Sequence, residues 1–266
     1  MTTGVLIFAF NNEHIDYLAM ANWSAQNIRR HLNLPVAVVT NMVVPLHYQF
    51  EQVIYAETTG VDSRKFEDIP ESVTWFNGNR VDAYSLSPWS QTLLLDADYV
   101  VASNQLKTIL DSDQDFLAHD RAHDITNHQN FDDHDHFGNY RMPMWWATVI
   151  MFRRSQHAEL IFDCMQMIRN NWNHYRSLYN IRRSTYRNDF ALSIALGIVN
   201  GHTLDYPSIP WSLASLGHDQ QLTQINQDNY RVDFDTQTNR PKWIQVAQDF
   251  HAMGKAQLGA IIDNCC

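Results

Sequence analysis

Residues 4–12, Gly-Val-Leu-Ile-Phe-Ala-Phe-Asn-Asn, decide the fold class of this chain. The continuous apolar run Val5–Phe10, bounded by Gly4 and by two asparagines, is typical of a strand that is covered on both faces. Apolar residues at helical spacing follow it and end near Leu34-Pro35, and Val36–Val39 is a second apolar run. A strand–helix–strand opening predicts an α/β fold with a mostly parallel central sheet flanked by helices.

The rest of the chain continues the alternation and shows no internal repeat or linker, so we expect a single domain over residues 1–266. Patterns of apolar residues predict the remaining elements. Strands are expected at Val53–Tyr55, Thr92–Leu95, Phe116–Ala118, Trp145–Phe152 and Trp243–Val246; helices at Ser72–Ser87, Leu106–Leu110, Ala158–Tyr175 and Phe190–Val199; and irregular polar segments at Asp120–Tyr140 and Gln220–Arg240.

The composition excludes several classes of protein. The chain has 266 residues, is 45% hydrophobic and contains three cysteines, two of them the adjacent pair Cys265 and Cys266, which cannot build a disulfide framework. Apolar runs are too short to span a bilayer, and the first residues lack the features of a signal peptide. We therefore expect a soluble, cytoplasmic protein without a membrane partner. Its oligomeric state is left open.

The strongest chemical signal is Leu93-Leu94-Leu95-Asp96-Ala97-Asp98. It places two carboxylates at the carboxyl end of a buried strand, which is where open α/β sheets bind their ligands. Two like charges brought together there need a compensating cation. A divalent ion held by carboxylates and substrate phosphates is the usual solution, so Asp96 and Asp98 are predicted to bind a metal.

Residues 87–101, Ser-Pro-Trp-Ser-Gln-Thr-Leu-Leu-Leu-Asp-Ala-Asp-Tyr-Val-Val, resemble the Asp-x-Asp segment of nucleotide-sugar glycosyltransferases with the GT-A fold. The glycogenin-like enzymes of family 8 are the nearest match. The resemblance implies a GT-A-type fold, a nucleotide-sugar donor such as a UDP-sugar, and Mn²⁺ or Mg²⁺ on Asp96 and Asp98. It also implies that Asp96 faces the ribose of the nucleotide.

Two later segments resemble the same family. Phe250-His251-Ala252-Met253-Gly254-Lys255 is similar to the His-x-x-Gly-x-x-Lys motif, which implies that His251 is the third metal ligand and that Lys255 holds the diphosphate. Here the lysine follows the glycine directly, two residues early. The resemblance also implies that Asn188 and Asp189, at the start of a helix, face the donor sugar as the candidate catalytic residues.

The resemblance further implies that the two halves of the chain have different roles. Residues 1–118 form the nucleotide-sugar half and residues 119–266 form the acceptor-side half. Arg80 matches a basic position that contacts the nucleotide. Ala9, Phe10 and Asn11, at the end of the first strand, occupy the position that binds the base.

The net charge of −10 hides an asymmetry that bears on the acceptor. Residues 140–188 contain eight arginines and two acidic residues, and aromatic residues lie between them. Arginines beside aromatic rings suit a nucleic acid, so DNA with a hydroxylated base and a saccharide or glycoconjugate both remain possible acceptors. The candidate acceptor residues are Trp145, Trp146, Arg176, Arg182 and Arg183.

Other chemistries are weighed against this hypothesis. The loop after Ala118 contains a group of side chains that can bind zinc, but their spacing matches no zinc motif: His119, His123, His128, His134 and His136 with Asp132, Asp133 and Asp135. No glycine-rich phosphate loop is present, which excludes Rossmann dehydrogenases and P-loop enzymes. A metal-dependent nucleotidyltransferase and a non-catalytic sugar-nucleotide binder remain as alternatives, and retention or inversion of the anomeric carbon stays open.

Overall fold

The structure is a computed structural model that describes residues 2–58, 61–65, 71–76, 78–127, 135–182, 185–203, 205–217, 219–235 and 240–263. Its largest sheet within these residues has six strands, in the order β3-β2-β1-β6-β12-β8. The strands are β1 (Thr3–Phe8), β2 (Val36–Thr40), β3 (Gln52–Tyr55), β6 (Gln91–Leu95), β8 (Phe116–His119) and β12 (Trp146–Arg153).

The centre of this sheet is parallel. β1 pairs in parallel with β2 on one side and with β6 on the other, with Val5 opposite Val36 and Leu93. β12 is antiparallel to both of its neighbours. Every residue of β2 and β6 is buried, as expected for strands that are covered on both faces. The predicted fold class, α/β with a mostly parallel central sheet, is confirmed.

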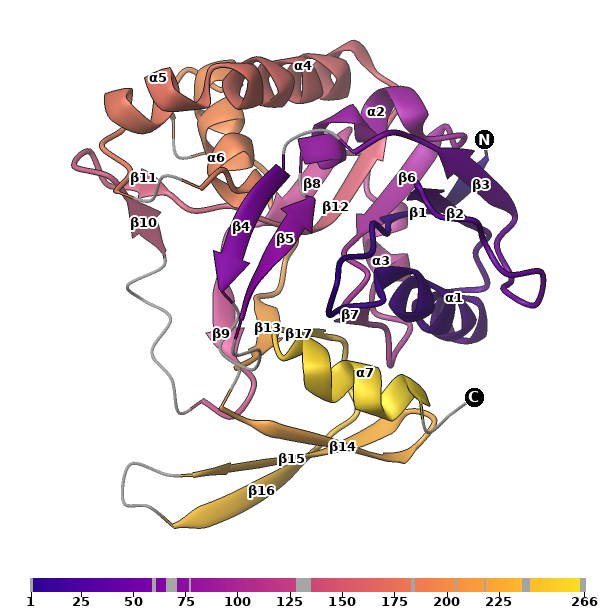
Figure 1. Ribbon diagram of the computed structural model, residues 1–266. Helices are drawn as coiled ribbons and strands as arrows, with labels where there is room; N and C mark the ends of the chain where they lie inside the picture. The colour runs from indigo at the N-terminus through magenta and orange to yellow at the C-terminus, as the bar shows by residue number, and fades with distance from the viewer. Residues whose placement is uncertain are drawn as a thin grey trace.

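Helices cover both faces of the sheet (Figure 1). The helix α1 (Tyr17–Leu32) connects β1 to β2, begins where the Asp16 side chain accepts a hydrogen bond from Ala19 N, and ends at Asn33 in the left-handed conformation. On the other face lie α4 (Gln156–Asn170), α5 (Trp172–Leu178) and α6 (Asn188–Val199). The short elements η1 (Gly78–Asp82), α2 (Ala83–Leu86) and α3 (Lys107–Leu110) complete the connections.

A second, four-stranded sheet adjoins the end of β6. Its order is β7-β17-β13-β9, with β7 (Tyr99–Val100), β9 (Ala122–Asp124), β13 (Leu213–Leu216) and β17 (Phe250–Ala252). β7 begins directly after Asp98, and His251 of β17 pairs with Tyr99. This pairing brings a residue from the end of the chain beside the carboxyl end of β6. The helix α7 (Lys255–Asp263) follows.

Two segments differ from the sequence prediction. The described part of the segment 220–240 is not irregular, because it contains β14 (Gln221–Asn226) and β15 (Asn229–Asp235). These two strands form an antiparallel sheet with β16 (Pro241–Val246) at the lower edge of Figure 1. The predicted helix over 72–87 is wrong in its first part, because β5 (Ser72–Phe76) pairs with β4 (Val61–Lys65). The β-branched and aromatic residues Val73, Thr74, Trp75 and Phe76 favour a strand.

The polar segment over 120–140 contains β9 and also β10 (His136–Phe137), which pairs with β11 (Met142–Pro143) just beyond it. None of the helices in the described part of the chain is both long and apolar enough to cross a membrane.

Candidate active site

A pocket lies at the edge of the central sheet where β1 and β6 end. Because β12 is antiparallel to β6, with Val149 opposite Leu95, its first residues reach the same edge. The β4–β5 hairpin and the start of α7 complete the wall. The pocket is lined by Phe8, Phe10, Tyr17, Trp75, Phe76, Asn79, Arg80, Asp96, Ala97, Asp98, Trp146, Ala147, Thr148, Arg187, Asn188, Asp189, His251, Met253 and Lys255.

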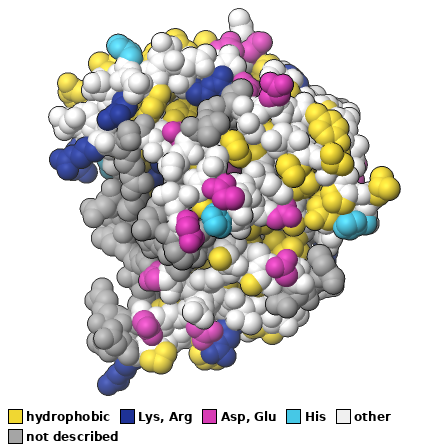
Figure 2. Space-filling view, in the orientation of Figure 1, with side chains coloured by type: hydrophobic (Ala, Val, Ile, Leu, Met, Phe, Trp, Pro, Cys, Tyr) yellow, Lys and Arg dark blue, Asp and Glu magenta, His cyan; other side chains and the backbone are white. Residues whose placement is uncertain are grey.

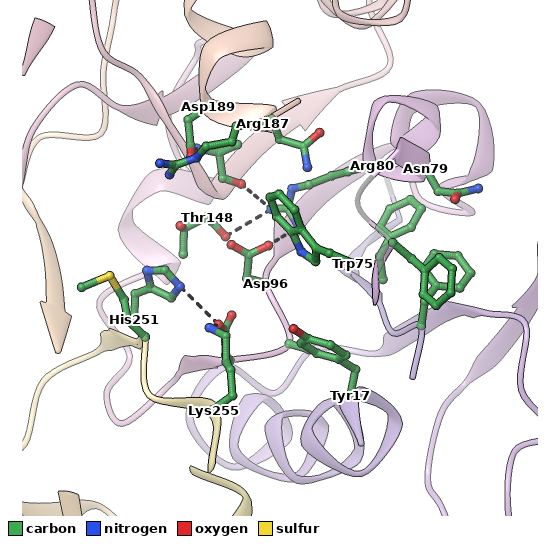
Figure 3. A pocket seen from close by; sticks show the side chains of 18 of the residues that line it. Tyr17, Trp75, Asn79, Arg80, Asp96, Thr148, Arg187, Asp189, His251 and Lys255 are labelled. Atoms are coloured by element: carbon green, nitrogen blue, oxygen red, sulfur yellow. Dashed lines mark hydrogen bonds and ion pairs between the residues drawn. The ribbon is translucent and has the colours of Figure 1, made fainter. Parts of the chain in front are cut away.

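The pocket brings together most of the residues that the sequence singled out. Figure 3 shows Asp96 in the middle, His251 and Lys255 on one side, and Arg187 and Asp189 on another. In the space-filling view, acidic and histidine side chains adjoin one another near the centre of the same face (Figure 2). The five residues named here come from three distant parts of the chain, so the fold, and not sequence proximity, assembles the site.

Asp96, Asp98 and His251 form a cluster suited to a metal ion. Each offers one ligand atom, and these atoms all lie within 4.8 Å of one another. Two carboxylates and an imidazole nitrogen are ligands that Mn²⁺ accepts, and the carboxylates also suit Mg²⁺. The donor set of this structure therefore fits the divalent ion that the resemblance implies. Among the described residues, no other group of three or more histidine, cysteine, aspartate or glutamate side chains lies close enough together to hold a metal ion.

Lys255 pairs with the inner carboxylate of the cluster. Its Nζ atom contacts Asp98 Oδ2 and donates a hydrogen bond to the carbonyl of Ala252 at 3.2 Å. His251 Nε2 lies 3.3 Å from the same Asp98 oxygen. The side chains of Lys255 and Asp98 are both buried, at 8% and 7% exposure, so each needs the opposite charge of the other.

Arg80 holds the outer carboxylate. Its Nη1 atom lies 2.7 Å from Asp96 Oδ1, and its guanidinium also donates to the backbone carbonyls of Leu95, Ala147 and Thr148. The Arg80 side chain is buried, whereas that of Asp96 is one-third exposed. These donors are therefore directed at Asp96 and at the backbone of two strands, while the rest of the Asp96 carboxylate faces the pocket.

Asp189 is fixed by two partners at the start of α6. Its Oδ1 atom accepts a hydrogen bond from Ala147 N at 3.0 Å, and its Oδ2 atom lies 2.5 Å from Arg187 Nη2. Burial alone would raise the pKa of the Asp189 carboxyl, but the Arg187 guanidinium and the Ala147 N–H together bring that pKa below its usual value. Asp189 is therefore ionised over the whole neutral range.

Aromatic rings form the opposite side of the pocket. Tyr17 and Trp75 both line it (Figure 3), as do Phe8, Phe10 and Phe76. The hairpin that carries Trp75 is fastened to the β1–α1 loop, because Asn12 Nδ2 donates to Thr74 O at 2.9 Å and Glu13 Oε1 accepts from Thr74 N at 2.8 Å. Sequence reasoning missed Tyr17 and Trp75.

Two of the residues expected to bind the base do not line the pocket. Ala9 is fully buried, and its N–H extends the pairing of β1 by donating to Val39 O at 2.9 Å. The Asn11 side chain accepts from Leu18 N at 2.8 Å and donates to Asp16 at the same distance, so it fastens the start of α1. Phe10, the third of these residues, does line the pocket.

The candidate acceptor residues separate. Trp146 lines the pocket of the Asp-x-Asp segment, whereas the neighbouring Trp145 lines another pocket, where its ring packs edge-on against Tyr206 with centroids 5.7 Å apart. Arg182 is exposed beside a third pocket, with Phe137 and Phe190. Arg176 is half-buried on α5. Arg183 lies outside the described residues.

Much of the arginine-rich segment is used inside the protein. Arg153 donates to the carbonyls of Leu110 and Ser112, Arg154 donates to that of Ser87, and Arg169 donates to that of Gly78. Arg187 pairs with Asp189. Four of the eight arginines in residues 140–188 therefore have partners inside the protein, and the acceptor hypothesis that relied on this segment, DNA, receives no support.

The alternative metal site in the histidine-rich loop also receives no support from the described residues. His128, Asp132, Asp133 and His134 lie outside them. His119 is fully buried, its Nδ1 atom lies 2.9 Å from the carbonyl of Trp211, and burial lowers its pKa to about 4. His123 is half-buried, which also lowers its pKa.

The fold and the site together define an α/β protein with an Asp-x-Asp cluster at the carboxyl edge of its sheet. No protein-family model matches the sequence, and no curated protein matches it. Among solved structures, the chain is similar to the galactosyltransferase LgtC in complex with donor and acceptor sugar analogues, at 11% identity over 72% of this chain and 70% of that chain, with a TM-score of 0.47.

It is also similar to the glycosyltransferase GlyE of Streptococcus pneumoniae TIGR4, at 13% identity over 78% of this chain and 45% of that chain, with a TM-score of 0.45. A third similar structure is mouse xyloside xylosyltransferase 1, at 13% identity over 76% of this chain and 83% of that chain, with a TM-score of 0.44. All three are glycosyltransferases by name.

Proposed function

We propose that the protein is a metal-dependent glycosyltransferase of the GT-A type. It transfers a sugar from a nucleotide-diphosphate sugar to an acceptor hydroxyl. The sequence resemblance favours a UDP-sugar as the donor. The observation that carries the proposal is the cluster of Asp96, Asp98 and His251 in a pocket with an aromatic wall. The cluster suits a cation that binds a diphosphate, and the wall suits the base of a nucleotide.

The proposed roles follow from these contacts. Asp96, Asp98 and His251 would hold the divalent ion, which when bound supplies Lewis-acid stabilisation of the departing diphosphate. Arg80 fixes the orientation of the Asp96 carboxylate. Lys255 lies at the pocket, where its ammonium group can pair with a phosphate oxygen. The first half of the chain supplies the two aspartates, and the second half supplies His251, Lys255 and the start of α6.

Asp189 is proposed to orient the donor sugar. Its carboxylate lines the pocket and still has lone pairs for sugar hydroxyls, although each oxygen already has one partner. Its lowered pKa makes it a poor base. Asn188 precedes it on α6 and lines the same pocket, so the two residues present one acidic and one amide side chain to the sugar.

The proposed acceptor is a hydroxyl of a saccharide or glycoconjugate, which Trp146, from the wall of the same pocket, helps to position. DNA is kept as an outcome of the test, because four of the arginines that suggested it direct their guanidinium groups at partners inside the protein.

The test incubates the protein with Mn²⁺, a panel of nucleotide sugars, and saccharide or DNA acceptors. Release of free nucleoside diphosphate together with a glycosylated acceptor is expected. Release of pyrophosphate supports a nucleotidyltransferase instead, and binding without any product supports a sugar-nucleotide binder. Asp96→Asn is the inactive control, and Asp163→Asn, a change of the same kind at an exposed position on α4, is its matched active control.

A further inference from the structure

Lys255 neutralises a carboxylate that the proposed metal ion also needs. Its Nζ atom contacts Asp98 Oδ2, the same oxygen that lies 3.3 Å from His251 Nε2. Both Lys255 and Asp98 are almost completely buried, and a buried ion pair is expensive to open unless new partners replace the old ones. A divalent ion that enters this cluster therefore competes directly with the ammonium group.

The Asp96 carboxylate also has a cationic partner, because Arg80 Nη1 lies 2.7 Å from its Oδ1 atom. The pocket thus contains three carboxylates, those of Asp96, Asp98 and Asp189, and three cations of the chain itself, Arg80, Lys255 and Arg187. A divalent ion arriving alone would find little uncompensated negative charge and would be repelled by an ammonium group at Asp98. The arrangement favours weak binding of the ion by itself.

The position of Lys255 in α7 is not explained by helix stability. Lys255 is the first residue of this nine-residue helix, where the helix dipole is positive and a cation is unfavourable. Asp98 offsets that cost in the structure. A negatively charged ligand in the pocket would offset it equally well, and the flexible four-carbon stem of lysine allows the ammonium group to change partner.

We propose that Lys255 is an exchangeable counter-cation for Asp98, so that the divalent ion and the nucleotide diphosphate bind together and the ion alone binds weakly. This inference rests on the proposed function. The diphosphate brings the negative charge that the site lacks, and it gives Lys255 a new partner as the ion takes its place at Asp98. Lys255 then serves both as a contact for the donor and as a barrier to metal binding in its absence.

The experiment measures Mn²⁺ binding by the electron paramagnetic resonance signal of the free ion, in the absence of any turnover. Without nucleotide, Lys255→Met is expected to bind Mn²⁺ at least about tenfold more tightly than the unmodified protein, equivalent to about 1.4 kcal/mol. UDP is expected to raise the Mn²⁺ affinity of the unmodified protein strongly and that of Lys255→Met much less.

Two control variants accompany it. Lys255→Arg keeps the positive charge and is expected to bind Mn²⁺ as weakly as the unmodified protein does. Lys107→Met makes the same change at an exposed position on α3 and is expected to have no effect. Since Lys255→Met removes the ammonium partner of the buried Asp98 carboxylate, Mn²⁺ should raise the Tm of this variant more than that of the unmodified protein. If Lys255→Met does not fold, the same measurements are made on Lys255→Gln.

If folded Lys255→Met binds Mn²⁺ no more tightly than the unmodified protein does, the inference is overturned. The inference is also overturned if UDP binds to the unmodified protein but leaves its Mn²⁺ affinity unchanged. This result needs no variant, so it applies even if neither Lys255→Met nor Lys255→Gln folds. A protein that binds none of UDP, GDP, CDP and ADP, with or without Mn²⁺, contradicts the proposed function itself, so the two failures are distinguishable.

Discussion

The guanidinium group of Arg80 links the Asp96 carboxylate to the backbone of two neighbouring strands. Its Nη1 atom lies 2.7 Å from Asp96 Oδ1 and 3.4 Å from Leu95 O of β6, and its Nη2 atom donates to Thr148 O of β12 at 3.3 Å. Only a planar group with several donors can satisfy these acceptors at once. Arg80 therefore fixes the place of Asp96 in the pocket and also stabilises the edge of the sheet.

The first prediction concerns this residue. Arg80→Lys keeps the charge but loses the fork of donors, which leaves buried carbonyls or the carboxylate without a partner. We expect the free energy of unfolding to fall by about 3 kcal/mol, and transferase activity to fall with it. Urea denaturation measures the first effect. Arg121→Lys, at an exposed position, is the matched control. An unchanged midpoint for Arg80→Lys would contradict this account of the contacts.

The second prediction separates the two aspartates. Asp96→Asn and Asp98→Asn should each reduce turnover more than tenfold, equivalent to more than about 1.4 kcal/mol in the barrier, because the metal loses a charged ligand. Their effects on stability should differ. Asp96 is one-third exposed, whereas the substitution at Asp98 leaves the buried Lys255 ammonium without its anion.

Activity assays and thermal unfolding on both variants check the second prediction. Asp98→Asn should lower the Tm clearly more than Asp96→Asn does. If either variant keeps more than about a tenth of the rate, that aspartate is not a ligand. Equal losses of Tm would instead argue against the buried pair of Asp98 and Lys255.

The third prediction concerns the stereochemistry of transfer. An inverting enzyme needs a carboxylate base, but Asp189 has a lowered pKa and both of its oxygens are engaged. We therefore expect the product to keep the anomeric configuration of the donor. Proton NMR of the first product formed distinguishes the anomers. Asp189→Asn should slow the reaction without changing the anomer, and an inverted product would assign Asp189, or another carboxylate, the role of base.

The sequence predicts the core of the fold well because the signals there are local. Val5–Phe10 and the leucines before Asp96 are continuous apolar runs, and the structure places them side by side as β1 and β6. Burial on both faces of a parallel sheet leaves few other interpretations of such runs. The metal-ligand cluster follows from the same feature, since Asp96 and Asp98 come directly after β6.

What the sequence did not predict depends on weaker or longer-range signals. In β15 the buried Tyr230, Val232 and Phe234 alternate with Arg231 and Asp233, a period of two that identifies a strand, but the polarity of the whole segment favours an irregular conformation. Trp75 reaches the pocket only because the hairpin β4–β5 is fastened to Asn12 and Glu13, about 60 residues earlier. No local pattern encodes that contact.

The arginine-rich segment shows the limit of charge counting. Arg153, Arg154 and Arg169 lie in a stretch of high positive charge, yet their guanidinium groups donate to backbone carbonyls at the ends of other elements. A sequence lists charges but not their partners. An excess of one sign therefore indicates a binding surface only where the side chains are exposed.

The last prediction concerns stability and pH. His119 is fully buried at the end of β8, its Nδ1 atom is 2.9 Å from Trp211 O, and its Nε2 atom has no hydrogen-bond partner among the described residues. Burial lowers its pKa in the folded protein to about 4, from 6.5 for an unperturbed histidine. Between these two pH values the unfolded chain binds a proton that the folded protein does not.

The neutral His119 should therefore contribute about 3 kcal/mol to the free energy of unfolding above pH 6.5. This contribution should be lost progressively as the pH falls toward 4. His119→Asn keeps a donor for the Trp211 carbonyl and cannot be protonated in this range. Urea denaturation of both proteins from pH 7 to pH 4 should show a weaker pH dependence for His119→Asn than for the unmodified protein. His174→Asn, at an exposed position, should leave the dependence unchanged. Parallel curves for His119→Asn and the unmodified protein would mean that His119 is protonated as easily in the folded state as in the unfolded state.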